Sequence, residues 1–274
     1  MTTAEAHRSL GIEIDGREPS PEQLRDAALN VYGHFTAMQV RDGRTRGLDL
    51  HLARLDSANR ELFGEPLDGE RIRELIRHAL QGESPDGVAG DASVRVIVRG
   101  EHASRGASGV RVFVTVRPPF TMSPEASQRL KSARYIRAVP HIKRPGDFGQ
   151  AYYIDRAIDA GYDDALLVAD DGTVAEAGIA NVAFFDGENV VWPDAPVLAG
   201  ITMQAVAPRL ADYGMPSRTA RVLLADVGGF AGACVTNSRG IAAVSAIDEV
   251  ELPIAAEFMK TMNAAYDAVA WDEI

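Results

Sequence analysis

The chain has 274 residues, of which 46% are hydrophobic and 24% are charged, a composition typical of a folded enzyme with one large core or two smaller ones. Its formal net charge of −11 argues against nucleic acid or an anionic membrane surface as the main partner. A single cysteine, Cys234, excludes an intrachain disulfide and a cysteine-based metal cluster, and the six histidines have no ligand spacing, so no metal site is expected. The scarcity of cysteine and the absence of a bilayer-length apolar run predict a cytoplasmic protein.

Residue patterns in the first half of the chain predict an α+β unit. Alternating apolar residues predict three strands, at 35–40, 94–100 and 109–118. Apolar residues at helical spacing predict two helices, at 51–64 and 69–82. Gly64 is expected to end the first of these helices.

A proline-rich stretch, RPPFTMSPEAS at 117–127, interrupts strand-like sequence and predicts a domain boundary. We therefore expect a small α/β domain over 1–118, a linker over 119–125 and a larger domain over 126–274. The larger domain is expected to be rich in hairpins, with turns at Asp171-Gly172 and Asp186-Gly187. Its other predicted elements are helices at 151–161, from Thr202 onward and at 253–269, and paired strands at 233–238 and 240–248.

Several polar residues stand out within apolar, element-forming sequence. Lys143 precedes a glycine-broken stretch, and Glu176 lies between a hairpin turn and the next strand. GIT at 200–202 begins a helix whose first N–H groups can point at an anion. Arg54 lies in an early helical turn, and TNSRG at 236–240 ends a strand with polar side chains. Taken singly, each has an ordinary interpretation as a cap, a turn or a solvated charge.

A lysine and a glutamate found together change this balance, because one cofactor chemistry requires both. A lysine amine is an effective covalent catalyst when it forms a Schiff base with an aldehyde. Pyridoxal 5′-phosphate (PLP) needs such a lysine, an acid at its ring nitrogen and a phosphate cup. Lys143, Glu176 and the anion-binding stretches match these three requirements.

Six stretches of the sequence, in order, carry a family resemblance. They are GHFTAMQVRDG (33–43), HLARL (51–55), HIK (141–143), GYDDALLVADDGTVAEAGIANVAFFDG (161–187), LAGITMQ (198–204) and CVTNSRGIAAV (234–244). Together they resemble the fold-type IV PLP enzymes, the class IV aminotransferases, over most of the chain. That family includes branched-chain aminotransferases, D-amino acid transaminases, aminodeoxychorismate lyases and (R)-selective amine transaminases. The resemblance implies a two-domain α+β fold, with a small α/β domain and a larger hairpin-rich pseudo-barrel domain.

The resemblance also implies a role for each matching residue. Lys143 would form the Schiff base and shuttle the proton, and Glu176 would pair with the pyridine nitrogen. The implied phosphate-binding residues are Arg54, Ile201, Thr202, Asn237 and Ser238, with main-chain N–H groups at 201 and 202 and the Thr202 hydroxyl among the donors. The substrate-pocket residues implied in the small domain are Phe35 and Ala37.

The chain departs from the family pattern near the substrate. Branched-chain enzymes carry a tyrosine where this chain has Phe148, an arginine is replaced by Met203, and the run 177–180 lacks the usual hydroxyl groups. The D-amino acid enzymes bind the donor's carboxylate with an arginine and a histidine just after the strand at 94–100. Candidates for that role here are His102 and Arg105, in a different spacing, and Arg41, Arg95, Arg99, Arg144 and Arg239.

The resulting expectation is an aminotransferase that uses PLP and a ping-pong mechanism. It would move an amino group from an amino acid or an (R)-amine to a 2-keto acid, and family members are usually homodimers. Two alternatives stay open: an elimination enzyme like aminodeoxychorismate lyase, and a non-catalytic ligand-binding protein on the same fold. No GxGxxG, GxSxG or HExxH motif points to another enzyme class.

Overall fold

The computed structural model describes residues 11–81, 90–100, 109–123 and 125–274. Two of the residues proposed for the substrate carboxylate, His102 and Arg105, lie outside this part of the chain.

The described chain divides into two compact units. The first comprises the described residues up to Phe120 together with Lys143–Gly146 and Trp271–Ile274. The second comprises Thr121–Ile142 and Asp147–Ala270. The domain bounds expected from the sequence stay a prediction, because compact packing does not show which parts fold independently.

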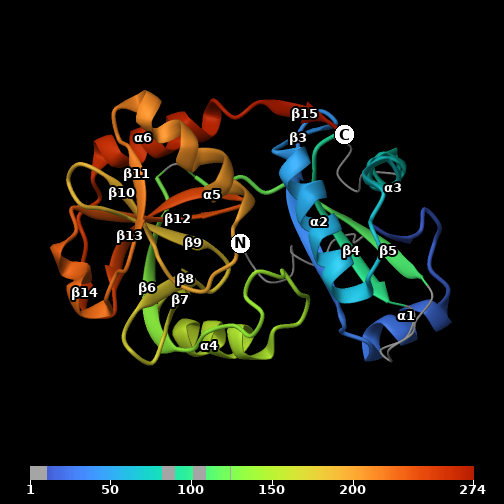
Figure 1. Ribbon diagram of the computed structural model, residues 1–274, viewed down its shortest axis with the longest axis horizontal. Coiled ribbons are helices and arrows are strands. Elements are labelled where there is room, and N and C mark those ends of the chain that lie inside the picture. Colours follow the sequence, from blue (N-terminus) through green and yellow to red (C-terminus); the bar gives the residue numbers. More distant parts are fainter. Residues whose placement is uncertain (1–10, 82–89, 101–108, 124) are drawn as a thin grey trace. The chain divides into compact units, whose positions relative to one another are not determined.

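A four-stranded antiparallel sheet forms the centre of the first unit, in the order β1-β5-β4-β2. Its strands are β1 (Gly11–Ile14), β2 (Gly33–Val40), β4 (Ala92–Gly100) and β5 (Val110–Arg117). The helices α2 (Leu48–Phe63) and α3 (Gly69–Gln81) pack on one face of this sheet (Figure 1). The three strands and two helices predicted for this region are therefore confirmed, although α2 begins three residues earlier than expected.

Period-two alternation explains why the helices cover only one face of the sheet. Val94, Val96 and Val98 of β4 are buried in the core that α2 and α3 complete. Arg95 and Arg99 alternate with them and therefore belong to the opposite face.

Gly64 ends α2 as predicted, because it adopts a left-handed conformation at φ 78°. Three short elements complete the unit: α1 (Pro21–Leu29), β3 (Arg44–Arg46) and β15 (Trp271–Glu273), which pairs with β3.

The second unit is built on a nine-stranded mixed sheet. The strand order is β11-β10-β9-β12-β13-β6-β7-β8, and β14 pairs with β13. The strands are β6 (Ser127–Arg134), β7 (Asp164–Val168), β8 (Val174–Ala177), β9 (Asn181–Phe185), β10 (Val190–Pro193), β11 (Ser217–Ala220), β12 (Gly232–Asn237), β13 (Gly240–Ile247) and β14 (Val250–Glu251).

This sheet curls into a half-barrel. The last strand in the order, β8, turns back to β9 through a tight connection in which the Ala177 N–H donates to the Ala180 carbonyl at 2.8 Å. The Val174 N–H donates to the Val222 carbonyl at 2.8 Å. Apolar side chains fill the curl, including the fully buried Phe184. The hairpin-rich pseudo-barrel expected for the larger domain is therefore confirmed.

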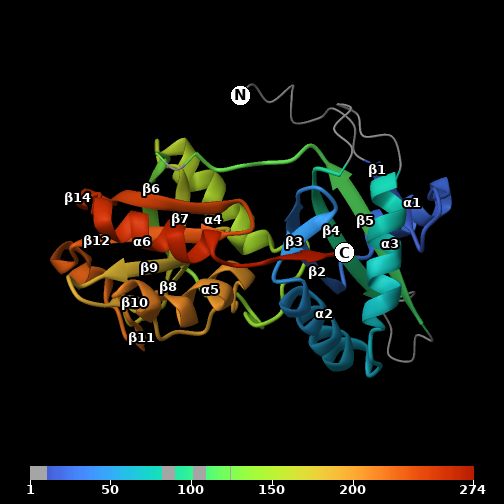
Figure 2. The same ribbon diagram turned by 90° about the horizontal axis from the view of Figure 1, so that it is seen from above.

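Helices cover the outer surface of the half-barrel (Figures 1 and 2). α4 (Phe148–Asp159) packs on β6 and β7. α5 (Ile201–Val206) packs on β12, and α6 (Ala256–Asp267) packs on β13. Short 3-10 helices span Ala207–Tyr213 and Leu224–Gly229. None of the helices in the described residues has the length and apolar character needed to cross a bilayer.

Most second-unit elements agree with the sequence, but strands β6, β11 and β14 and the 3-10 helix at Leu224–Gly229 were not predicted, and α4 differs at its start. The hairpins at 171–172 and 186–187, the strand pair β12-β13 and the helices α5 and α6 are confirmed. Strand β6 was missed, because its sequence SQRLKSAR offers only Leu130 as a strongly apolar residue. Helix α4 begins earlier than predicted, since the Asp147 carboxylate accepts the Gln150 N–H at 3.0 Å and caps it.

A buried histidine makes the first unit sensitive to acid. His34 of β2 is 1% exposed, and its Nε2 lies 3.4 Å from Oδ1 of Asn59 on α2. Burial lowers the pKa of His34 to about 4, although the Asn59 contact opposes the shift. The neutral ring is therefore the form that the folded state holds.

We expect the wild-type protein to lose stability as the pH falls from about 6.5 to about 4, because His34 binds a proton more readily in the unfolded chain. The neutral His34 ring contributes about 3 kcal/mol to the free energy of unfolding above pH 6.5, and this contribution is lost as the pH falls to about 4. His34→Gln should lack this component. Denaturant unfolding at several pH values measures it, and an identical pH dependence in the two proteins would contradict the assignment.

Candidate active site

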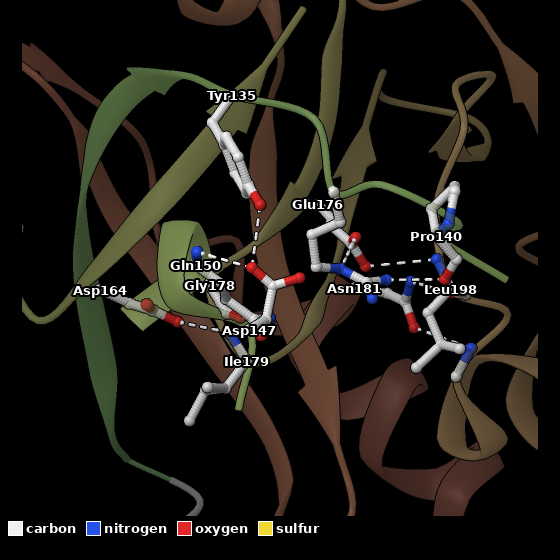
Figure 3. Close-up of polar contacts among 12 residues, drawn as sticks. Tyr135, Pro140, Asp147, Gln150, Asp164, Glu176, Gly178, Ile179, Asn181 and Leu198 are labelled. Atoms are coloured by element: carbon white, nitrogen blue, oxygen red, sulfur yellow. Dashed lines mark hydrogen bonds and ion pairs between the residues drawn. The ribbon is translucent and has the colours of Figure 1, made fainter. Parts of the chain in front are cut away.

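Glu176 lies inside strand β8, whereas the sequence suggested a position between a turn and the next strand. Its carboxylate is buried and forms an ion pair with Arg137, whose Nε lies 2.7 Å from Oε1 (Figure 3). The two side chains are 7% and 4% exposed. Arg137 is anchored in turn, since its Nη2 donates to the Pro140 carbonyl at 2.8 Å. The anion is therefore held in one orientation by a partner that is itself fixed to the main chain.

A second contact links Glu176 to the segment that leads into α5. The Leu198 N–H donates to Oε2 of Glu176 at 3.3 Å, and the Leu198 carbonyl accepts from the Asn181 amide at 2.7 Å. Oδ1 of Asn181 accepts the Gly200 N–H at 3.1 Å. A Cβ added at Gly200 would lie 2.0 Å from that oxygen, so this approach requires glycine. The start of α5 is thereby positioned against the same strands that carry Glu176.

Side chains of β7 and α4 hold the turn between β8 and β9 in place. Oδ2 of Asp164 accepts the Ile179 N–H at 3.2 Å, and the Gln150 amide donates to the Gly178 carbonyl (Figure 3). A Cβ at Gly178 would lie 2.1 Å from Oδ1 of Asp164. Burial raises the pKa of Asp164 to about 6, against the opposing effect of its main-chain hydrogen bonds. These contacts fix the chain directly after Glu176.

The phosphate-binding residues expected in the second unit lie at the start of α5 and at the β12-β13 turn. Ile201 and Thr202 form the first turn of α5, where helical N–H groups have no intrahelical acceptor. The Thr202 hydroxyl donates to the Asn237 carbonyl at 2.8 Å, which joins the two segments. Oδ1 of Asn237 accepts the Arg239 N–H at 2.8 Å, and Ser238 is half-buried in the same turn. The hydroxyl hydrogen of Thr202 is thus already used within the protein.

Arg54 lies in the second turn of α2, in the first unit. Its Nη2 donates to Oγ1 of Thr36 on β2, and the same oxygen lies 2.6 Å from Nδ1 of His51. Nε of Arg54 is buried without a hydrogen-bond partner in the described chain. Burial lowers the pKa of Arg54 to about 10, which still leaves it cationic at neutral pH. Because an unsatisfied buried donor costs about 1–3 kcal/mol, this guanidinium suits an anionic ligand.

Lys143 is one of the three lysines of the chain, and both its side chain and its main chain contact Phe35. Nζ of Lys143 lies 5.0 Å from the centre of the Phe35 ring, and the Lys143 carbonyl accepts the Phe35 N–H at 2.7 Å.

The expected substrate residues of β2 share one face with this ring. Phe35 and Ala37 are two residues apart and half-buried, on the sheet face away from α2 and α3. Cζ of Arg95 lies 5.7 Å from the centre of the Phe35 ring, and Arg95 is opposite Ala37 in the strand register. An aromatic ring is thus in contact range of two cations.

The predicted residues therefore form two groups. Arg54, Phe35, Ala37 and Lys143 belong to the first unit, and Glu176, Ile201, Thr202, Asn237 and Ser238 belong to the second. Three further residues went unnoticed in the sequence: Arg137, Thr36 and His51. A signal existed for His51, three residues before Arg54 on the same helix, but nothing distinguished Arg137 from a surface arginine.

Removing one member of the buried ion pair should cost more than removing both. Arg137→Met leaves the carboxylate of Glu176 buried without its partner, and we expect the free energy of unfolding to fall by about 3 kcal/mol. Arg137→Met combined with Glu176→Met should recover part of that loss. Urea unfolding at pH 7 measures Arg137→Met, Glu176→Met and the double variant, with Arg137→Lys as the charge-conserving control. A double variant that loses the sum of the single losses would contradict the pairing.

Comparison with known proteins places the chain in a family. A family model described as amino-transferase class IV matches residues 33–247. A probable branched-chain-amino-acid aminotransferase of Rickettsia felis is 29% identical over 142 residues, which are 49% of this chain. That match spans only 48% of the relative's length.

Solved structures agree with this family at the level of the fold. A fold IV-transaminase from Curtobacterium pusillum is 24% identical, with a TM-score of 0.74 over 87% of each chain. A hypothetical aminotransferase from Mycobacterium tuberculosis in its PLP-bound form is 21% identical, with a TM-score of 0.78 over 94% of this chain and 99% of that one. Since the family model covers most of its length, the chain belongs to the class IV aminotransferase family.

Proposed function

We propose that this protein is a PLP-dependent aminotransferase that moves an amino group from an amino acid or an (R)-amine to a 2-keto acid. Family membership supports this reaction class, and the residues that the chemistry requires are present in the described chain. The observation that carries the proposal is the environment of Glu176. A carboxylate is buried on a strand, ion-paired to Arg137 and fixed by the Leu198 N–H, as the partner of a pyridine nitrogen needs to be.

The proposed phosphate ligands fit a dianion. Arg54 supplies a half-buried guanidinium whose buried Nε has no acceptor in the described chain. The N–H groups of Ile201 and Thr202 belong to a first helical turn, where anions bind. We assign the contribution of Thr202 to its main chain, because its hydroxyl donates to Asn237. The Asn237 amide and the Ser238 hydroxyl are proposed to complete the set.

Lys143 is proposed to be both the covalent attachment point and the proton carrier. When bound, PLP supplies an electron-withdrawing ring that acidifies the C–H bond beside the donor's amino group. The donor's amine would replace Nζ of Lys143, and the freed Nζ would take that proton and later release it. Glu176 would hold the ring nitrogen in its protonated form. A keto acid would then accept the amino group, and ping-pong kinetics are expected.

Arg95 is proposed to bind the donor's carboxylate. It lies against the same Phe35 ring as Nζ of Lys143, so a group bound there would be near the amine that moves the proton. A guanidinium can bind a carboxylate through two parallel hydrogen bonds.

The first test is transamination itself. With PLP, a 2-keto acid and D-alanine, L-leucine, L-glutamate or (R)-1-phenylethylamine, we expect the wild-type protein to form a keto product from at least one donor. Lys143→Ala should abolish turnover, because no other group replaces the amine, while the exposed-lysine control Lys260→Ala should retain it. Turnover by Lys143→Ala would contradict the mechanism. Pyruvate release from aminodeoxychorismate without an acceptor would indicate the lyase instead.

The second test asks whether Arg95 recognises the carboxylate of the donor rather than its amine. Arg95→Gln should raise KM for donors that carry a carboxylate about tenfold, the effect of losing a charged hydrogen bond, and leave KM for (R)-1-phenylethylamine nearly unchanged. Arg117→Gln, which removes an exposed charge from the neighbouring strand β5, is the matched control. Equal effects of Arg95→Gln on both kinds of donor would contradict this role.

A further inference from the structure

Two buried residues of the first unit, Thr36 and His51, contact Arg54 in a chain of hydrogen bonds. Thr36 is 0% exposed on the helix-facing side of β2, and His51 is 3% exposed on α2. Arg54 lies three residues after His51, on the same side of the helix. Oγ1 of Thr36 accepts from Nη2 of Arg54 and lies 2.6 Å from Nδ1 of His51.

The direction of each hydrogen bond follows from the donors available. A guanidinium has only donors, so the Thr36 oxygen must accept from Arg54. The hydroxyl then has one hydrogen to place, and within the described residues its remaining neighbour at hydrogen-bond distance is Nδ1 of His51. Donation to Nδ1 satisfies this buried hydrogen. It also requires His51 to be neutral, with its proton on Nε2.

The charges around His51 agree with a neutral ring. Burial, followed by the positive charges of Arg54 and Lys143, lowers the pKa of His51 well below its ordinary value. A neutral His51 can accept from Thr36 across the whole neutral pH range. The arginine, the hydroxyl and the imidazole therefore form one ordered chain that ends in a buried acceptor.

This chain fixes one corner of the Arg54 guanidinium and leaves the rest for a ligand. Thr36 takes one hydrogen of Nη2, and Nε of Arg54 is buried with no acceptor in the described residues. A planar guanidinium held at one corner keeps its other donors in a fixed direction. That is the condition under which two donors can meet two oxygens of a phosphate together.

We propose that Thr36 and His51 are positioning residues that orient Arg54 for the phosphate group of the cofactor. This inference rests on the proposed function, because it concerns the same phosphate. The hydroxyl of Thr36 adds affinity for the phosphate without touching it, and its effect passes entirely through Arg54.

The test compares PLP with pyridoxal, which lacks the phosphate, in binding titrations of the cofactor-free protein. Thr36→Val keeps the shape of the side chain but removes the hydroxyl, and it should weaken PLP binding about tenfold while changing pyridoxal binding less than about twofold. Thr36→Ser restores the hydroxyl and should bind PLP almost as the wild type does. If Thr36→Val does not fold, Thr36→Ala is compared with Thr36→Ser in the same way.

A double-mutant cycle tests whether the effect passes through Arg54. In an Arg54→Gln background, Thr36→Val should cause no further loss of PLP affinity. An unchanged PLP affinity in Thr36→Val, equal losses for PLP and pyridoxal, or a full further loss in the Arg54→Gln background would each overturn the inference. A wild-type protein that binds neither compound would instead overturn the proposed function. Inorganic phosphate gives a readout independent of the cofactor, since it should raise the melting temperature of Thr36→Ser more than that of Thr36→Val.

Discussion

The buried ion pair between Glu176 and Arg137 is the interaction on which the second unit's site depends. A buried carboxylate is costly unless its oxygens are matched by donors, and here Arg137 and the Leu198 N–H supply them. Arg137 is itself tied to Pro140, and Leu198 is tied to Asn181. The direction of one carboxylate is therefore set by main-chain atoms from several separate segments of the chain.

In the first unit the residue of interest is a cation, Arg54, and it is oriented by neutral groups rather than by an ion pair. Arg54 is a half-buried cation that no carboxylate pairs with in the described contacts, and its fixed neighbours are neutral: a threonine hydroxyl and an imidazole. Neutral neighbours orient a cation without cancelling its charge. A basic ring nitrogen requires a nearby anion, and an anionic phosphate requires a cation whose charge is not cancelled.

Much of the fold could be predicted from the sequence because it follows local signals. The alternating valines of β4, the helical spacing of α2 and the Asp-Gly turns each express one rule over a few residues. Strand β6 lacked that signal, since its neighbours in the sheet rather than its own residues make it a strand.

The candidate site divides in the same way. Lys143, Glu176 and Arg54 could be named from their motifs, whereas Arg137 could not, because its partner lies 39 residues away and only the folded sheet brings them together. The hydrogen bond from the Thr202 hydroxyl to the main chain could not be predicted for the same reason. Its hydroxyl donates to a carbonyl 35 residues further along the chain, a contact that no local pattern encodes.

The most direct measurement would locate the covalent bond between the cofactor and the chain. The purified protein is incubated with PLP, the lysine–aldehyde linkage is fixed with sodium borohydride, and the digested peptides are analysed by mass spectrometry. Because the chain has three lysines, the result is unambiguous. We expect one modified peptide, the one that contains Lys143. Modification of Lys131 or Lys260 in its place, or of no lysine at all, would contradict it.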